Sequence, residues 1–317
     1  MLPYFHDTAV AVIDDDPTYL ESFMFRLSPV GNLKAFQDPE AAVRYLIMDA
    51  PKPPSIAKYV ERNSENLTAG EIDRGDRVIH FHGHYIRDLQ QDRARSGQVS
   101  VIVVDYNMPK MNGLQVCRAI QPLPCRKVLL TGKATKSIGI DALNSGLIDA
   151  YFEKQDEDLS TKIQESISFH KKLYFQDLSS PLVTTLKRLE SDFLDDEDVI
   201  DVFERVCQSY SISEYFLTTE MPGFQMRDAK GDEWWLGIFN KEELELYAEL
   251  VGELDSKSEV ASMLRAGQVV PNSPANVFCE QATKSNLSNL IEPATAVGGD
   301  GKHFYTVARR KSWTRSQ

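Results

Sequence analysis

The sequence predicts an α/β fold in which a doubly wound, five-stranded parallel sheet is followed by a second, smaller α+β domain. Two observations carry this prediction. Short apolar runs alternate with helix-like segments through the first half of the chain, as they do in successive βαβ units. Runs such as Val101–Val104 show no polar alternation, which indicates strands buried on both faces of a parallel sheet. The length of 317 residues is typical of two domains.

The elements of the first domain follow one another in a regular order. The predicted strands are Ala9–Ile13, a weaker one at Asn32–Phe36, Val99–Val104, Lys127–Leu130 and Ala150–Phe152. The predicted helices between them are Pro17–Leu27, Pro39–Met48, Gly113–Ile120 and Ser137–Ser145. A last helix, Asp156–Phe175, should end where Ser179, Ser180 and Pro181 interrupt the helical pattern. The first domain is therefore assigned to residues 1–178, with 156–178 as its last helix and linker.

One interval, from about residue 50 to 98, interrupts this alternation. It opens with three prolines and then carries a helix-like stretch, Glu71–Arg95. A structureless loop of this length would be unusual in a compact domain, so the interval is predicted to be an inserted helical element. His80, His82 and His84 lie within it, but a spacing of two places side chains on one face only in a strand. Solvent or interface histidines are favoured over a metal or phosphohistidine site, and their role stays open.

Residues 179–317 are predicted to form an α+β domain of unknown type. A helical region, Leu182–Tyr210, contains the acidic run Asp195–Asp198, which is typical of a solvated helix face. The predicted strands are Tyr215–Thr219, Gly223–Arg227, Glu233–Phe239 and His303–Ala308, with a turn at Asp228–Gly231. The predicted helices are Lys241–Leu254 and Lys257–Ala266.

Composition and charge narrow the function classes. The chain carries 35 Lys and Arg against 47 Asp and Glu, a formal charge of −12, whereas nucleic-acid-binding proteins are normally basic. Residues 180–317 hold 14 basic and 23 acidic residues, a net charge of −9, which disfavours a DNA-binding second domain. The four cysteines form no CxxC pair. No apolar stretch is long enough to span a membrane and no secretory signal is evident, so a cytoplasmic protein without membrane contact is expected.

Polar residues that could carry chemistry follow four of the predicted strands. Asp14, Asp15 and Asp16 come after the first strand, and Asp105, Thr131 and Lys154 each follow a later one. Because the carboxyl ends of parallel strands meet at one edge of a sheet, these groups should share a small site. Clustered carboxylates require a cation, and an all-oxygen cluster suits Mg²⁺. The expected chemistry is phosphoryl transfer to a carboxylate.

The order of these motifs resembles the receiver domain of two-component response regulators, which has a flavodoxin-like fold. The segments that carry the resemblance are Ala11–Pro17, Val103–Pro109, Met111–Gly113, Leu129–Thr131 and Tyr151–Lys154. Together they cover about residues 6–175, interrupted by the insertion. The resemblance implies a phosphorelay protein that receives a phosphoryl group from a sensor histidine kinase or a histidine phosphotransfer protein.

The resemblance also implies a role for each site residue. Asp105 would be the phospho-acceptor. Asp14 and Asp15 would bind Mg²⁺ together with Asp105 and the backbone carbonyl of Asn107. Thr131 and Lys154 would contact the phosphoryl group, and Tyr151 would act with Thr131 as the conformational switch that controls the second, output domain. Lys133, two residues after Thr131, is a further basic neighbour of the site.

Two other functions are weighed against a response regulator whose output domain binds a protein or a small ligand. One is a DNA-binding transcriptional regulator, which the acidic second half disfavours. The other is a Mg²⁺-dependent aspartyl phosphatase, whose DxDx(T/V) nucleophile motif the sequence Asp14–Pro17 matches poorly. No enzymatic activity is expected beyond self-phosphorylation and autodephosphorylation. The long helix after Lys154 is compatible with a homodimer.

Overall fold

The computed structural model describes residues 1–53, 60–62, 79–81, 84–132, 136–188, 192–218, 221–299 and 301–310. The chain divides into two compact units. The parallel-sheet unit comprises His6–Ile56 and Gln91–Pro181. The antiparallel-sheet unit comprises Met1–Phe5, Ala57–Gln90 and Leu182–Gln317, which makes it the larger of the two and not the smaller domain expected from the sequence. No helix in the described part of the chain is both long enough and apolar enough to cross a membrane.

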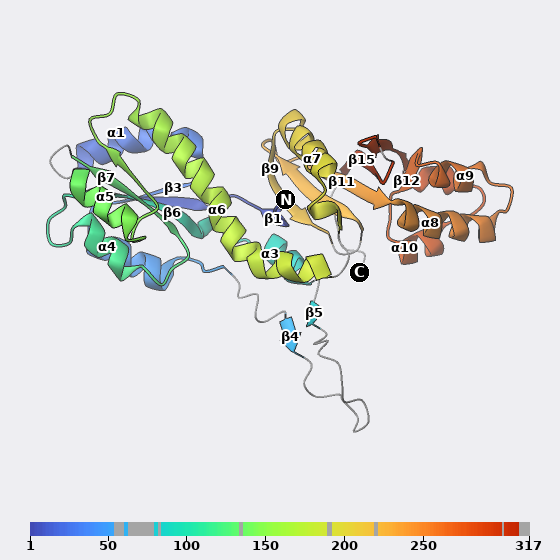
Figure 1. The fold of residues 1–317 in the computed structure, drawn as a ribbon, viewed down its shortest axis with the longest axis horizontal. Coiled ribbons are helices and arrows are strands. Elements are labelled where there is room, and N and C mark those ends of the chain that lie inside the picture. Colours follow the sequence, from blue (N-terminus) through green and yellow to red (C-terminus); the bar gives the residue numbers. More distant parts are fainter. Residues whose placement is uncertain are drawn as a thin grey trace, which may run out of the picture. The chain divides into compact units, whose positions relative to one another are not determined.

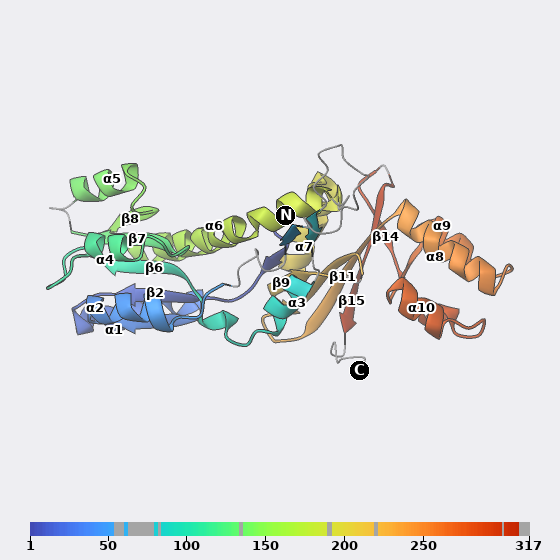
Figure 2. The same cartoon turned by 90° about the horizontal axis from the view of Figure 1, so that it is seen from below.

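The parallel-sheet unit has the predicted five-stranded sheet, with the strand order β3-β2-β6-β7-β8; Figure 1 labels β3, β6 and β7, and Figure 2 labels β2 and β8. The strands are β2 (Ala9–Ile13), β3 (Leu33–Phe36), β6 (Val99–Asp105), β7 (Arg126–Thr131) and β8 (Ala150–Glu153). Each neighbouring pair is parallel. Every residue of β2 and β6 is buried, as their continuous apolar sequences predicted.

Helices cover both faces of this sheet. They are α1 (Pro17–Leu27), α2 (Pro39–Arg44), α4 (Gly113–Ala119), α5 (Lys136–Asn144) and α6 (Leu159–Arg188), and α2 continues as a π-helical turn, Tyr45–Asp49. Phe23 of α1 and Ile163 of α6 belong to the core on one face. Leu46 after α2, Val116 of α4 and Ala142 of α5 belong to the core on the other. The fold is therefore a three-layer α/β/α arrangement.

The last helix of the first domain differs from the prediction. Helix α6 is 30 residues long and continues through Pro181 to Arg188, so the break predicted at Ser179–Pro181 is wrong. Proline removes one backbone hydrogen bond and disfavours a helix interior. Phe175 and Leu182, on either side of this point, are fully buried. The burial of these two side chains outweighs the local tendency of proline to end the helix.

The described part of the insertion contains strands as well as a helix. Strands β4 (Val60–Arg62) and β5 (Ile79–Phe81) pair antiparallel, and α3 (His84–Gln91) follows. The prediction of an inserted helical element is therefore wrong at β4 and β5, whereas α3 lies within the predicted helix-like stretch Glu71–Arg95. A two-stranded ribbon of three residues per strand carries too little periodicity to be recognised in a sequence. The rest of the interval lies outside the described residues.

The antiparallel-sheet unit is built on a six-stranded sheet of order β1-β9-β10-β11-β15-β14. The strands are β1 (Tyr4–Phe5), β9 (Ile212–Leu217), β10 (Gly223–Asp228), β11 (Glu233–Asn240), β14 (Thr295–Val297) and β15 (His303–Arg310). Tyr4 of β1 lies opposite Phe216 of β9. The assignment of residues 1–178 to one domain therefore requires correction, because the first strand pairs with the sheet of the other unit.

The C-terminal part of this unit contributes further helices and strands. They are α7 (Glu197–Ser209), α8 (Lys241–Leu254), α9 (Glu259–Arg265), α10 (Ala275–Gln281) and a separate pair of strands, β12 (Val269–Pro271) and β13 (Ile291–Pro293). Helices α8, α9 and α10 group together (Figure 2) and share one core with Trp235 and Phe239 of β11. The α+β class was predicted, but β1, β12, β13, β14 and α10 were not.

The pairing of β1 leads to a stability prediction. Tyr4 is only 1% exposed. Tyr4→Ala should lower the free energy of unfolding of the antiparallel-sheet unit by about 3 kcal/mol, because a large buried side chain is removed. Trp234 and Trp235 both lie on β11 of the same sheet, so their emission during denaturant unfolding reports on it.

Leu246→Ala, in α8 of the same unit, is the control, because Leu246 is 50% exposed and its truncation should change little. If Tyr4→Ala leaves the tryptophan-detected transition unchanged, β1 does not contribute to this sheet in solution.

Candidate functional site

The parallel register brings four predicted polar residues to one edge of the sheet. Strand β2 pairs with β6, β6 with β7, and β7 with β8, all in the same direction. Asp14 directly follows β2, and Lys154 directly follows β8. Asp105 and Thr131 are the last residues of β6 and β7. The carboxyl ends of four strands therefore present the site, as expected for an open parallel sheet.

Lys154 lies between two buried carboxylates. Its Nζ is 2.7 Å from Oδ2 of Asp14 and 3.0 Å from Oδ2 of Asp105. Asp14 is 1% exposed and Asp105 is 5% exposed. Buried charges are stable only when they are paired, and here one ammonium group serves two carboxylates. The three groups together keep a net negative charge.

The ionisation of this cluster follows from its burial. Burial raises the pKa of Asp14, and the hydrogen bond from Lys154 offsets this only in part. Burial alone would lower the pKa of Lys154, but its hydrogen bonds to Asp14 and Asp105 outweigh burial and raise that pKa. Lys154 therefore stays charged at neutral pH, while the ionised form of Asp14 is left insufficiently compensated. A further cation would stabilise it.

The donor set fits a hard divalent cation. Asp14, Asp15 and Asp105 each offer a carboxylate oxygen, and these atoms lie within 4.8 Å of one another. Asp16, the predicted third acid, instead caps α1 by accepting hydrogen bonds from the backbone N–H groups of Thr18 and Tyr19. Oxygen ligands from one or two carboxylates, with waters completing the shell, are what Mg²⁺ binds.

The loop that follows β6 is held by backbone hydrogen bonds on either side of Tyr106. The Gly113 N–H donates to the Tyr106 carbonyl at 3.0 Å, and the Tyr106 N–H donates to the Leu130 carbonyl at 2.8 Å. Gly113 is required here, because a Cβ at this position would lie 2.4 Å from the carbonyl oxygen of Asp105. No donor in the described ranges reaches the Asn107 carbonyl, which is therefore available as a ligand.

Thr131 and Tyr151 occupy the neighbouring strand ends. Thr131 is fully buried, and its hydroxyl donates a 3.4 Å hydrogen bond to the Phe152 carbonyl. The Tyr151 side chain is partly buried against the core on the sheet face that α4 and α5 cover. Its ring lies against Gly139 of α5, where a Cβ would come within 3.1 Å of Cγ. Tyr151 thus links the site to α5. Lys133 lies outside the described residues.

Comparisons with known proteins agree with this geometry. The family model of the response regulator receiver domain matches residues 85–164. The structure of the Legionella pneumophila response regulator LqsR matches 98% of this chain and 89% of its own length, with 25% sequence identity and a TM-score of 0.72. The chain is a response regulator with a receiver domain. No curated protein sequence matches it.

Two other solved structures are similar to part of this response regulator. The receiver domain of the Francisella response regulator 1452 is 15% identical, covers 52% of this chain and 98% of its own, and has a TM-score of 0.34. A Clostridium thermocellum response regulator receiver domain protein is 21% identical, covers 52% and 98%, and has a TM-score of 0.31. The matched family range begins after Asp14 and Asp15, which the insertion separates from the other motifs.

The structure adds one residue to the receiver site that the sequence reasoning missed. The ring centroid of Tyr19 lies 4.3 Å from Nζ of Lys154. Tyr19 stands in the first turn of α1, three residues after the capping Asp16. An aromatic residue in the first turn of the helix that follows the acidic run was the available signal. Of the histidines of the insertion, His80 lies on β5 and His84 begins α3, both in the antiparallel-sheet unit, and His82 is outside the described residues.

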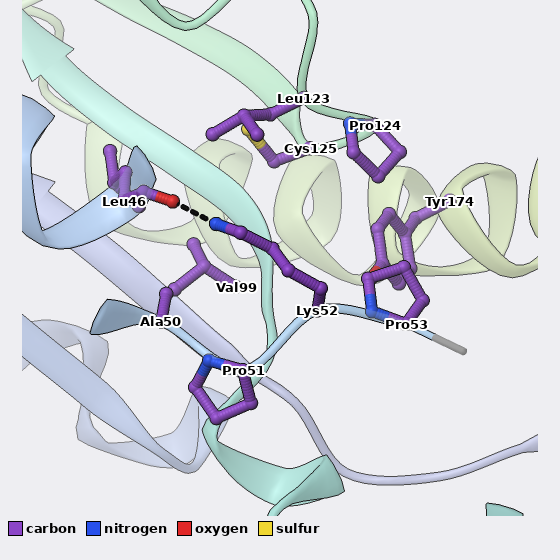
Figure 3. Close-up of a pocket in the computed structure, with 10 residues that line it drawn as sticks. All are labelled: Leu46, Ala50, Pro51, Lys52, Pro53, Val99, Leu123, Pro124, Cys125 and Tyr174. Carbon is purple, nitrogen blue, oxygen red and sulfur yellow. Dashed lines mark hydrogen bonds between the residues drawn. The ribbon is translucent and has the colours of Figure 1, made fainter. Parts of the chain in front are cut away.

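A separate, small hollow of about 20 Å³ lies at the amino ends of the strands (Figure 3). Its lining is mostly apolar: Leu46, Ala50, Pro51, Lys52, Pro53, Val99, Leu123, Pro124, Cys125 and Tyr174. The Lys52 ammonium group donates to the Leu46 carbonyl. Burial raises the pKa of the Cys125 thiol, which therefore stays protonated. This hollow offers no set of acids and bases comparable with the carboxyl edge.

The raised pKa of Asp14 predicts that its ionised carboxylate lowers the stability of the metal-free fold, although cation binding requires that carboxylate. A group with a raised folded-state pKa stabilises the fold below its unfolded pKa, and this contribution is lost as the pH rises through the folded value. At pH 7 and without divalent cations, Asp14→Asn should therefore raise the free energy of unfolding, by about 1 kcal/mol. The same substitution should abolish the stabilisation that Mg²⁺ confers on the wild type, as followed by circular dichroism.

Asp15→Asn serves as the comparison, because Asp15 is more exposed than Asp14 and receives no hydrogen bond from Lys154. It should weaken the Mg²⁺ effect with little change in stability. A loss of stability in metal-free Asp14→Asn would contradict the electrostatic account.

Gly113 provides a steric prediction. Gly113→Ala should destabilise the receiver domain by about 1–3 kcal/mol and weaken the Mg²⁺-dependent stabilisation, because the added methyl group displaces the Asp105 backbone. Gly252→Ala in α8 is the control, since nothing lies within 4 Å of a Cβ there and alanine favours a helix. Equal effects of the two substitutions would contradict the close approach at Gly113.

Proposed function

We propose that this response regulator accepts a phosphoryl group on Asp105 from a sensor histidine kinase or a histidine phosphotransfer protein. One observation carries the proposal. Asp105 lies at the carboxyl edge with its Oδ2 3.0 Å from the ammonium group of Lys154 and with Asp14 and Asp15 beside it. A carboxylate nucleophile, a fixed cation and further metal ligands are the groups that phosphoryl transfer to an aspartate requires.

Each residue has a distinct part in this transfer. A carboxylate oxygen of Asp105 attacks the phosphorus of the phosphohistidine, the P–N bond breaks, and the imidazole leaves with the electron pair. Lys154 donates hydrogen bonds to the equatorial phosphoryl oxygens and offsets their charge. Asp14, Asp15, Asp105 and the Asn107 carbonyl would hold Mg²⁺, which supplies additional positive charge to the phosphoryl oxygens when it is bound.

The proposed switch uses Thr131 and Tyr151. A phosphoryl group adds about −1.5 to −2 charges at Asp105 and three acceptor oxygens. In this structure the Thr131 hydroxyl donates a hydrogen bond to the Phe152 carbonyl. At 3.4 Å this bond is long and therefore weak. The hydroxyl can exchange this bond for one to a phosphoryl oxygen. Movement of Thr131 would allow Tyr151, packed against Gly139, to rearrange with α5.

The antiparallel-sheet unit is proposed as the output domain, binding a protein or a small ligand in the cytoplasm. Its own hydrophobic core around Trp235 and Phe278 supports an independent binding domain. The net charge of −9 over residues 180–317 supports a partner other than nucleic acid.

Phosphorylation by a small-molecule donor tests the acceptor assignment. Incubation with acetyl phosphate and Mg²⁺ should add one phosphoryl group, detected by intact-mass spectrometry, and chelation of Mg²⁺ should prevent it. Asp105→Asn should remain unmodified, whereas Asp38→Asn, at the N-cap of α2, should be modified as the wild type is. Labelling of Asp105→Asn at the wild-type rate would refute the assignment.

A further inference from the structure

The ring of Tyr19 covers the ammonium group of Lys154. The ring centroid is 4.3 Å from Nζ, well within the range in which an aromatic face attracts a cation. Tyr19 is held in place by the start of α1, because its backbone N–H donates to the Asp16 carboxylate at 3.1 Å. The cap that starts the helix therefore also sets where this ring lies.

A second ring fixes Tyr19 from the core side. Phe23 stacks on Tyr19 with a centroid distance of 5.4 Å and an interplanar angle of 20°. Phe23 is fully buried in the core between α1, α6 and the sheet. Tyr19 therefore cannot swing away from Lys154 without disturbing that core.

The Tyr19 ring covers a third side of the Lys154 ammonium group. The other two sides face Oδ2 of Asp14 at 2.7 Å and Oδ2 of Asp105 at 3.0 Å. A lysine side chain has four flexible methylene groups, and holding it in one position costs conformational entropy. A rigid aromatic face restricts that freedom and directs the charge towards the carboxyl edge.

We propose that Tyr19 is a positioning residue for phosphoryl transfer to Asp105, whose ring holds the Lys154 ammonium group where it meets the incoming phosphoryl oxygens. This inference rests on the proposed function and deepens it. The ring carries the role and not the hydroxyl, because Tyr19 Oη is buried and has no hydrogen-bond partner in the described part of the chain.

The test compares an aromatic with an aliphatic substitution at Tyr19. The rate of phosphorylation by acetyl phosphate with Mg²⁺ should fall about threefold to thirtyfold in Tyr19→Leu, because the aromatic face is lost. Tyr19→Phe should recover most of the wild-type rate, since it restores the ring. Arg26→Met is the matched control: Arg26 lies 5.9 Å from the same ring but belongs to the far end of α1, so the rate should be unchanged.

A spectroscopic measurement separates positioning from a merely structural effect. The side-chain methylene protons of Lys154 should show an aromatic ring-current shift in the wild type and in Tyr19→Phe, and should lose it in Tyr19→Leu. If Tyr19→Leu does not fold, Tyr19→Met, which fills irregular space better, takes its place. The inference is overturned if the aliphatic variant is phosphorylated at the rate of Tyr19→Phe, or if the Lys154 signals do not change.

The same experiments distinguish this inference from the proposed function. If the wild type itself is not phosphorylated, the proposed function fails, while the ring-current comparison still decides whether Tyr19 holds Lys154. If the wild type is phosphorylated and the aliphatic variant equals Tyr19→Phe, the function stands and the role of Tyr19 is refuted.

Discussion

The pairing of one ammonium group with two buried carboxylates is the interaction on which the receiver site depends. Lys154 follows the edge strand β8, yet its Nζ reaches Asp105 after β6 and Asp14 after β2. Without Lys154, two nearly inaccessible carboxylates would lie together with no compensating charge. Burying unpaired charges in this way destabilises a protein by several kcal/mol. The same pairing leaves a net negative charge at the edge, so the site is both stable enough to fold and disposed to take a further cation.

The parallel sheet makes this pairing possible over a long sequence separation. Asp14 and Asp105 are 91 positions apart in the chain, and the insertion lies between them. They meet because β2 and β6 are neighbours in parallel register, with Ile13 opposite Val104. The entropy cost of closing a longer loop grows only slowly with its length, so an insertion at this point is tolerated. The geometry of the site therefore depends on the order of the strands in the sheet and not on the length of the connection between them.

The aromatic residues on α1 connect this site to the core. Tyr19 faces Lys154, and Phe23 stacks behind it in the core shared with α6. The order of these groups follows from helical periodicity, since residues four apart lie on one face of a helix. In the antiparallel-sheet unit, β1 is an edge strand of only two residues, Tyr4 and Phe5, and it pairs with β9. In both units, short segments near the start of the chain complete structures built from residues far along it.

The sequence by itself determined the five parallel strands, their alternation with helices, and the gathering of Asp14, Asp105, Thr131 and Lys154 at one edge. It could do so because buried strands and capped helices are encoded locally, and parallel strands must share a carboxyl edge. Only the tertiary structure decided where β1 pairs, that α6 continues through Pro181, and that the Tyr19 ring covers Lys154. These outcomes depend on packing between residues distant in the chain, which can outweigh local preference and which a local sequence pattern does not specify.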